Sequence, residues 1–311
     1  MEIGLKDTIP TYAGGLGILA GDVVRSSADL KLPLIAVTLV SKKGYFKQKL
    51  TNNGEQLELP IEWMPSEFAS LQPEEVEVEI ENRRVKVKAW LYECRPRSSI
   101  GEVVPVCFLD TDVEGNSMKD RAITHFLYGG DERYRLKQEI VLGIGGVRLL
   151  RKLNFNIRRY HMNEGHSSLL TVELLRENEV DEKKVKNMCI FTTHTPVEAG
   201  HDKFSYNLFH EVAGEPIPLD VLRKYGGSDR LNMTRLALNL SEYINGVSKR
   251  HGDLTEQLFP GFEIQAITNG IYSYLWTADP FKKIFDAYFP GWALEPEILV
   301  RVDSVSDEEI W

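Results

Sequence analysis

Hydrophobic residues occur in two patterns along the chain, one typical of helices and one typical of buried strands. After Gly17, apolar side chains recur every three or four residues up to Leu30, with polar residues between them, which predicts a helix. Residues 131–153 keep the same spacing over a longer stretch and predict a second helix. Short runs of consecutive apolar residues predict buried strands; they lie at 32–40, 103–112, from Ile157 onward, at 188–193, at 244–247 and at 262–270.

Residues 75–94 depart from this pattern because apolar and charged residues alternate along them. Alternate valines share one face of each of two predicted strands, and a turn near Asn82-Arg83 joins them into a hairpin. Strands that alternate with helices elsewhere in the chain predict an α/β fold with a mainly parallel sheet. We therefore expect a Rossmann-like α/β lobe that carries an antiparallel hairpin insertion at about 70–95.

Composition narrows the class of protein. The chain has 311 residues, of which 42% are hydrophobic and 27% are charged, which is typical of a globular chain with a sizeable core. Its net charge of −9 disfavours nucleic acid as a partner, and no apolar run approaches the length of a membrane span. Three cysteines at wide spacing predict neither a disulfide framework nor a zinc site, so we expect a cytoplasmic protein with no membrane partner.

A run of glycines precedes the first predicted helix. Gly14, Gly15 and Gly17 lie where the backbone N–H groups of a helix start have no intrahelical partner. Those groups and the positive end of the helix dipole suit a phosphate or a sugar oxygen. The run is not GxGxxG, however, and a tight loop that needs positive φ explains the same residues.

Polar residues follow three of the predicted strands. Asn163, Glu164 and His166 come after one strand, His194 follows the next, and Asn269 follows the last. In open α/β sheets ligands bind beyond the carboxyl ends of the strands, so we expect these side chains to line one site. Structural histidines are the alternative. A metal site built from His194, Glu198 and His201 is disfavoured, because their spacing is neither HxxxH nor HExxH.

Several segments, in the same order, resemble the α-glucan (glycogen, starch or maltodextrin) phosphorylases, most closely the compact bacterial and archaeal type. They are MEIGLKDTIPTYAGGLGILAGD, RLKQE, MNEGHSS, FTTHTPVEAGHDKF, NGVSKRHG and TNG. The resemblance spans nearly all of residues 1–311. It implies the N-terminal lobe of a two-lobed GT-B fold, without the family's first βα unit and without its C-terminal, cofactor-binding lobe.

The resemblance also implies roles for individual residues. In that family the glycine loop lies over the catalytic phosphate and the terminal glucose, and a histidine meets the 6-hydroxyl of the sugar. This sequence departs from the family pattern at Glu164, which replaces an aspartate, and at Tyr272-Ser273. The implied roles are catalytic for His194; substrate-binding for Glu2, Gly15, Leu16, Asn163, Glu164, His166, His194 and Asn269; and cofactor-binding for Gly14 and Gly15.

The implied reaction transfers a terminal glucosyl unit of an α-1,4-glucan to inorganic phosphate, giving glucose 1-phosphate. Family enzymes carry pyridoxal phosphate on a lysine of the C-terminal lobe, and no segment here resembles that lysine motif. We therefore expect a chain that supplies the sugar-binding half of the site, is inactive alone, and needs a separate C-terminal lobe; homo-oligomers are also implied.

Two other functions stay open at this stage. One is a non-catalytic remnant or glucan-binding module. The other is half of a sugar-nucleotide glycosyltransferase, which would want Lys-x-Gly-Gly-Leu where the chain has Tyr12-Ala13-Gly14-Gly15-Leu16.

Overall fold

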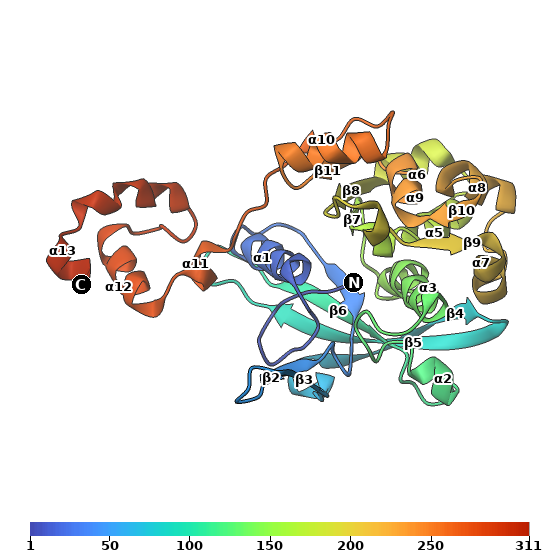
Figure 1. Ribbon diagram of the computed structural model, residues 1–311, viewed down its shortest axis with the longest axis horizontal. Coiled ribbons are helices and arrows are strands. Elements are labelled where there is room, and N and C mark those ends of the chain that lie inside the picture. The colour runs from blue at the N-terminus through green and yellow to red at the C-terminus, as the bar shows by residue number, and fades with distance from the viewer. Residues whose placement is uncertain (311) are drawn as a thin grey trace.

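The computed structural model describes residues 1–310 and contains two four-stranded sheets with helices packed around and between them (Figure 1). The first sheet is mixed: β1 and β6 are parallel, and β5 and β4 continue it antiparallel. The second sheet is parallel throughout. The strand orders are β1(Ala36–Leu39)-β6(Val104–Asp110)-β5(Arg83–Cys94)-β4(Ser70–Ile80) and β12(Gln265–Ala266)-β11(Tyr243–Gly246)-β8(Cys189–Thr193)-β7(Tyr160–Asn163).

The mixed α/β class, a parallel sheet and the antiparallel hairpin at about 70–95 are confirmed, but the strands form two four-stranded sheets and the hairpin belongs to one of them. The predicted hairpin supplies β4 and β5, half of the first sheet, and its turn at Glu81 and Asn82 has φ of 52° and 59°. Two consecutive residues with positive φ are typical of the type I′ turns whose twist matches that of a hairpin.

The two predicted helices are both present. α1 (Gly15–Asp29) follows the glycine run, and residues 131–153 form α3 (Glu132–Ile140), a π-helical turn (Val141–Gly145) and α4 (Gly146–Lys152). A Cβ on Gly143 would lie 2.6 Å from the Leu170 nitrogen, so glycine permits close packing of this helix against the segment that starts α5. Gly143 lowers the intrinsic helix propensity of this stretch, but it lets the two backbones approach closely.

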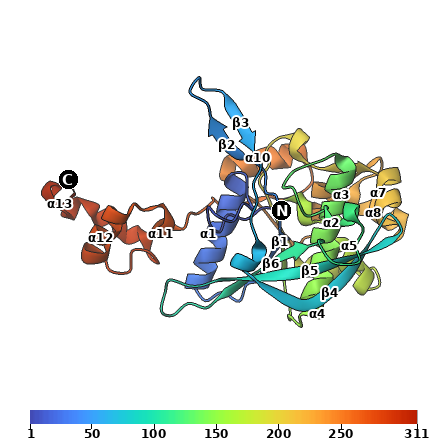
Figure 2. The same cartoon turned by 90° about the horizontal axis from the view of Figure 1, so that it is seen from below.

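The other elements surround these. Figure 2 shows the β2–β3 hairpin projecting from the body. Their bounds are β2 (Lys47–Leu50), β3 (Gln56–Leu59), β9 (Lys203–Ser205), β10 (Arg230–Asn232), α2 (Met118–Arg121), α5 (Leu170–Glu177), α6 (Glu182–Met188), α7 (Tyr206–Ala213), α8 (Leu219–Gly226), α9 (Met233–Asn239), α10 (Lys249–Leu258), α11 (Ser273–Trp276), α12 (Asp279–Tyr288) and α13 (Asp307–Ile310), with 3₁₀ turns at Pro65–Glu67, Gly165–Ser167, Glu198–Gly200 and Pro296–Ser304.

One hydrophobic core joins the two sheets. It includes Val87 and Leu109 of the first sheet, Leu136 of α3, and Met162 and Phe191 of the second sheet. A smaller cluster lies between α1 and the other face of the first sheet. The C-terminal helices α11–α13 lie to one side of the body and form a third cluster of their own (Figure 1).

Two buried aspartates of α1 hold the start of this C-terminal unit. Asp22 accepts hydrogen bonds from the Tyr272 backbone N–H at 3.1 Å and from the Trp276 indole at 2.8 Å. Asp29 accepts one from the Tyr272 hydroxyl at 2.7 Å. Tyr272, where the sequence departs from the pattern of the family it resembles, therefore anchors the C-terminal unit on α1.

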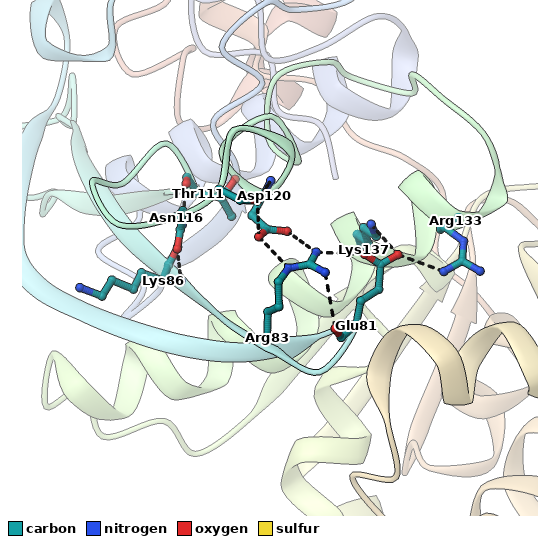
Figure 3. Close-up of polar contacts among 9 residues, drawn as sticks. Glu81, Arg83, Lys86, Thr111, Asn116, Asp120, Arg133 and Lys137 are labelled. Atoms are coloured by element: carbon teal, nitrogen blue, oxygen red, sulfur yellow. Dashed lines mark hydrogen bonds and ion pairs between the residues drawn. The ribbon is translucent and has the colours of Figure 1, made fainter.

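A set of ion pairs surrounds the hairpin turn (Figure 3). Glu81 pairs with Lys137 of α3 at 2.8 Å and with Arg83 at 2.9 Å, and Asp120 of α2 pairs with Arg83 at 2.8 Å. Arg133 bridges Glu81 to Glu211 of α7. The network therefore ties the tip of the hairpin to three helices.

Among residues 1–310, no helix is both long enough and apolar enough to cross a membrane.

Candidate active site

The glycine loop is tied to the N-terminal segment by a buried carboxylate. Glu2 accepts hydrogen bonds from the backbone N–H groups of Ala13 at 2.6 Å and Gly14 at 3.2 Å, and from the hydroxyl of Tyr128 at 3.0 Å. A Cβ on Gly17 would lie 3.0 Å from Glu2 Oε2 and 2.5 Å from the Tyr12 Cβ. Glycine is needed at 17 so that the carboxylate can approach the loop.

The alternative of a tight loop with positive φ is wrong. None of Gly14, Gly15 and Gly17 is among the described residues with positive φ. The N–H group of Gly14 is occupied by Glu2, whereas those of Gly15, Leu16 and Gly17 have no partner within residues 1–310. The Glu2 carboxylate therefore already faces the positive end of the helix dipole, and the three free donors of the first turn stay available to a sugar or phosphate oxygen.

A second buried carboxylate lies at the end of β7. Glu164 has a φ of 68° and a ψ of 167° and is 3% exposed. Its Oε2 accepts hydrogen bonds from His194 N at 2.8 Å, Thr195 N at 3.0 Å and Thr195 Oγ1 at 2.9 Å, and its Oε1 accepts one from Gly165 N at 3.1 Å. This carboxylate therefore joins the end of β7 to the loop that follows β8.

His194 lies in that loop with an unused ring nitrogen. Its Nε2 is buried and has no hydrogen-bond partner in the described part of the chain. Burial lowers the pKa of His194 to about 4, so the ring is neutral at pH 7 and Nε2 can exchange a hydrogen bond with a hydroxyl group. The side-chain oxygen of Asn163, at the end of β7, is likewise buried without a partner among residues 1–310.

His166, which the sequence predicts as a site residue, lies beside three residues that sequence reasoning missed: Tyr128, Arg135 and Asp202. Its Nε2 is 3.8 Å from Asp202, which accepts a hydrogen bond from Arg135 at 3.1 Å. The Arg135 guanidinium lies 4.9 Å from the centre of the Tyr128 ring, whose hydroxyl donates to Glu2. Burial and the nearby Arg135 keep the pKa of His166 well below its usual value.

Weak signals for the missed residues do exist in the sequence. Arg135 lies in the RLKQE segment, which helix packing alone explains, and Asp202 directly follows the THTPVEAGH segment. Tyr128 precedes two glycines just before the helix predicted at 131–153. None of the three shows its role until α3 and the loop after β8 are placed together.

Glu139, one turn beyond Arg135 on α3, is a fully buried acid in the same region. Neither carboxyl oxygen has a hydrogen-bond partner among the described residues, and the Arg135 Nε is 3.4 Å away. Burial raises the pKa of Glu139 well above its usual value, which favours the neutral carboxylic acid.

A cavity of about 680 Å³ opens beside these residues. Tyr128, Arg135 and Asp202 form part of its wall and connect it to Glu2 and His166. None of the residues predicted from the sequence lines it. The lining residues are Tyr128, Gly129, Gly130, Asp131, Glu132, Arg135, Glu198, His201, Asp202, Lys203, Phe204 and Arg230.

The predicted site residues are partly gathered. Glu2 holds the loop that contains Gly14, next to Gly15 and Leu16, and reaches Tyr128, whose ring centre is 6.0 Å from that of His166. Glu164 and His194 join by a hydrogen bond. Asn269 is exposed at the end of β12, where its N–H donates to the Val247 carbonyl at 3.1 Å, and no contact between its side chain and the others is found within residues 1–310.

Neither a metal nor a Schiff-base cofactor finds its ligands among the described residues. They contain no group of three His, Cys, Asp or Glu side chains that could hold a metal ion. No lysine among residues 1–310 is fully buried; Lys137 pairs with Glu81, and Lys249 is exposed. The residues present therefore do not fit the attachment of pyridoxal phosphate.

Fold and candidate site together define an α/β protein that presents free backbone N–H groups at the start of α1 and a neutral histidine after β8. No model of a known protein family matches the chain. Individual relatives match all of it: maltodextrin phosphorylase of Thermococcus litoralis at 36% identity, and the glycogen phosphorylases of Mycobacterium tuberculosis at 33% and Aquifex aeolicus at 30%.

Over its whole length the chain is therefore similar to α-glucan phosphorylases. It spans 40% of the length of the Thermococcus and Mycobacterium proteins and 49% of the Aquifex protein. The resemblance carried by the sequence motifs is thereby confirmed.

Proposed function

We propose that this chain supplies the sugar-binding half of an α-1,4-glucan phosphorylase site, within a Rossmann-like lobe of a GT-B enzyme. The complete site would transfer a terminal glucosyl unit to inorganic phosphate and release glucose 1-phosphate. One observation carries the proposal: two buried carboxylates hold loops that present the free N–H groups of Gly15, Leu16 and Gly17 and the unpartnered Nε2 of His194.

The chemistry of these groups suits a sugar better than a metal or a fixed cation. A neutral imidazole both donates and accepts hydrogen bonds, as a sugar hydroxyl does. Backbone N–H groups at a helix start favour oxygen atoms with negative or partial negative charge. We assign the 6-hydroxyl of the terminal glucose to His194 and Asn269, and the sugar and phosphate oxygens to the Gly15–Gly17 amides.

The phosphate-activating half has to come from other polypeptide. The described residues do not fit the attachment of pyridoxal phosphate, so we assign to them no catalytic step that uses this cofactor. The partners proposed are an α-1,4-glucan, phosphate and a separate C-terminal lobe, in a homo-oligomer. Free, buried Cys94, Cys107 and Cys189 support a reducing compartment, and we assign the cytoplasm.

The experiment mixes this chain with the C-terminal part of the Thermococcus litoralis relative, pyridoxal phosphate, maltoheptaose and phosphate, and measures glucose 1-phosphate. Product is expected only from the complete mixture, and His194→Ala should lower its rate at least 100-fold. His210→Ala, on the exposed face of α7, is the matched control and should leave the rate unchanged.

Absence of product from the complete mixture, together with maltoheptaose binding by this chain, would favour a non-catalytic glucan-binding module instead. Absence of both would remove the family function from this chain.

A further inference from the structure

Glu164 has a backbone conformation that glycine normally occupies. Its φ of 68° and ψ of 167° lie in a region that side chains with a Cβ rarely adopt. The residue is nevertheless a glutamate and is almost completely buried. Such a conformation persists only where the surrounding contacts determine it, and in this molecule those contacts are made by its carboxylate.

The carboxylate is fully used by the chain itself. It accepts hydrogen bonds from Gly165 N, His194 N, Thr195 N and Thr195 Oγ1. Four donors match the roughly four lone-pair sites of a carboxylate, so little capacity remains for a sugar hydroxyl. A direct substrate contact, as the sequence predicts for this residue, conflicts with this saturation.

The bonds join two neighbouring strand ends. The Glu164 backbone N–H donates to the Thr192 carbonyl at 2.9 Å, and its side chain then holds the next residues of the same loop, His194 and Thr195. The loop after β8 is thus fixed from β7 at its first two residues, His194 and Thr195. Glu2 uses the same device on Ala13 and Gly14 of the glycine loop.

We infer that Glu164 is a positioning residue: it fixes the main chain of His194 and Thr195 so that the imidazole is presented to the ligand, and it does not touch the sugar. This role rests on the proposed function only for the identity of the ligand. The strained backbone at Glu164 is the conformation that aims its carboxylate at the loop.

Hydrogen exchange and glucan binding of the intact chain test the inference together. Glu164→Gly removes the carboxylate and also relieves the backbone, and Glu164→Gln replaces one acceptor oxygen by a donor group. Both variants should speed amide exchange in the segment 190–197 at least tenfold, with the larger effect for Glu164→Gly. The segment 170–177 of α5 should exchange at an unchanged rate, and the dissociation constant for maltoheptaose should rise at least tenfold.

Glu179→Gly is the matched control, because Glu179 is an exposed glutamate with a φ of 52° away from the site. It should change neither exchange in 190–197 nor binding. Unchanged exchange in 190–197 for both Glu164 variants would overturn the inference, as would faster exchange with unaltered affinity. If the unmodified chain binds no maltoheptaose, the proposed function fails, whereas the exchange measurement still decides whether Glu164 fixes the loop; should Glu164→Gly not fold, Glu164→Gln gives that answer.

Discussion

Carboxylates perform different tasks in two regions of this molecule. At the candidate site, Glu2 and Glu164 are 7% and 3% exposed and accept hydrogen bonds mainly from backbone N–H groups. At the hairpin turn, Glu81 and Asp120 accept them from arginine and lysine side chains, with Arg83 42% exposed (Figure 3). A backbone amide cannot move away without moving the chain, whereas an exposed side chain exchanges its partner for water. Glu2 and Glu164 thus fix the loops of the candidate site, whereas Glu81 and Asp120 fasten the hairpin to neighbouring helices.

Loss of the Glu2 carboxylate should have the largest effect on stability. Glu2→Ala leaves the N–H groups of Ala13 and Gly14 and the Tyr128 hydroxyl without their acceptor. Loss of these three partly buried hydrogen bonds should lower the free energy of unfolding, measured by urea denaturation, by about 3–5 kcal/mol. Glu55→Ala, on the exposed β2–β3 loop, is the control and should change that free energy by less than about 0.5 kcal/mol.

A Glu2→Ala variant as stable as the control would mean that the glycine loop holds its shape without this carboxylate. Its ligand amides would then be fixed by α1 alone, and the comparison drawn here would fail.

Acid should weaken the strand-end region next. Burial lowers the pKa of His194 from 6.5 to about 4. Between these values the unfolded chain binds a proton that the folded chain does not, so stability falls as the pH is lowered from 6.5 to 4 and this contribution levels off below 4. His194 should contribute about 1.4 kcal/mol per pH unit to the slope measured in urea titrations, and His194→Gln should lower the slope by that amount. Identical slopes in the two proteins would show that His194 is accessible to protons in the folded state.

Sequence patterns predicted the elements that carry the site better than the bonds within it. The helix after Gly17 and the strands β1, β6, β7, β8 and β11 follow from local spacing of apolar residues. The glycine run and the histidine and acid residues after the strands indicated a candidate site, whose binding role stays a prediction. Local spacing acts over a few residues, so it could be read without knowing the rest of the fold.

Long-range partners could not be obtained in this way. Glu2 meets Tyr128, and Asp22 meets Tyr272, across 126 and 250 residues. Glycine at 17 indicated a turn with positive φ, but its actual reason is the approach of Glu2 from a distant segment. The division into two sheets was missed for the same reason, because the hairpin pattern predicts β4 and β5 without saying that β5 pairs with β6.

The hairpin network should respond least to substitution. Lys137→Met removes the cation that contributes most to lowering the pKa of Glu81 to about 2. Since that pKa lies below its usual 4.5, the stability supplied by the pairing is present above pH 4.5 and is lost as the pH falls towards 2. At pH 7 we expect the free energy of unfolding to fall by about 0.5–1 kcal/mol, because Arg83 and Arg133 still neutralise the carboxylate and water screens the pairs.

This decrease should become smaller in 0.5 M salt, where the Debye length is only about 4–5 Å. Lys119→Met, an exposed position on α2, is the control. A decrease above about 2 kcal/mol that persists in salt would mean that the network stabilises the fold as the buried carboxylates Glu2 and Glu164 do.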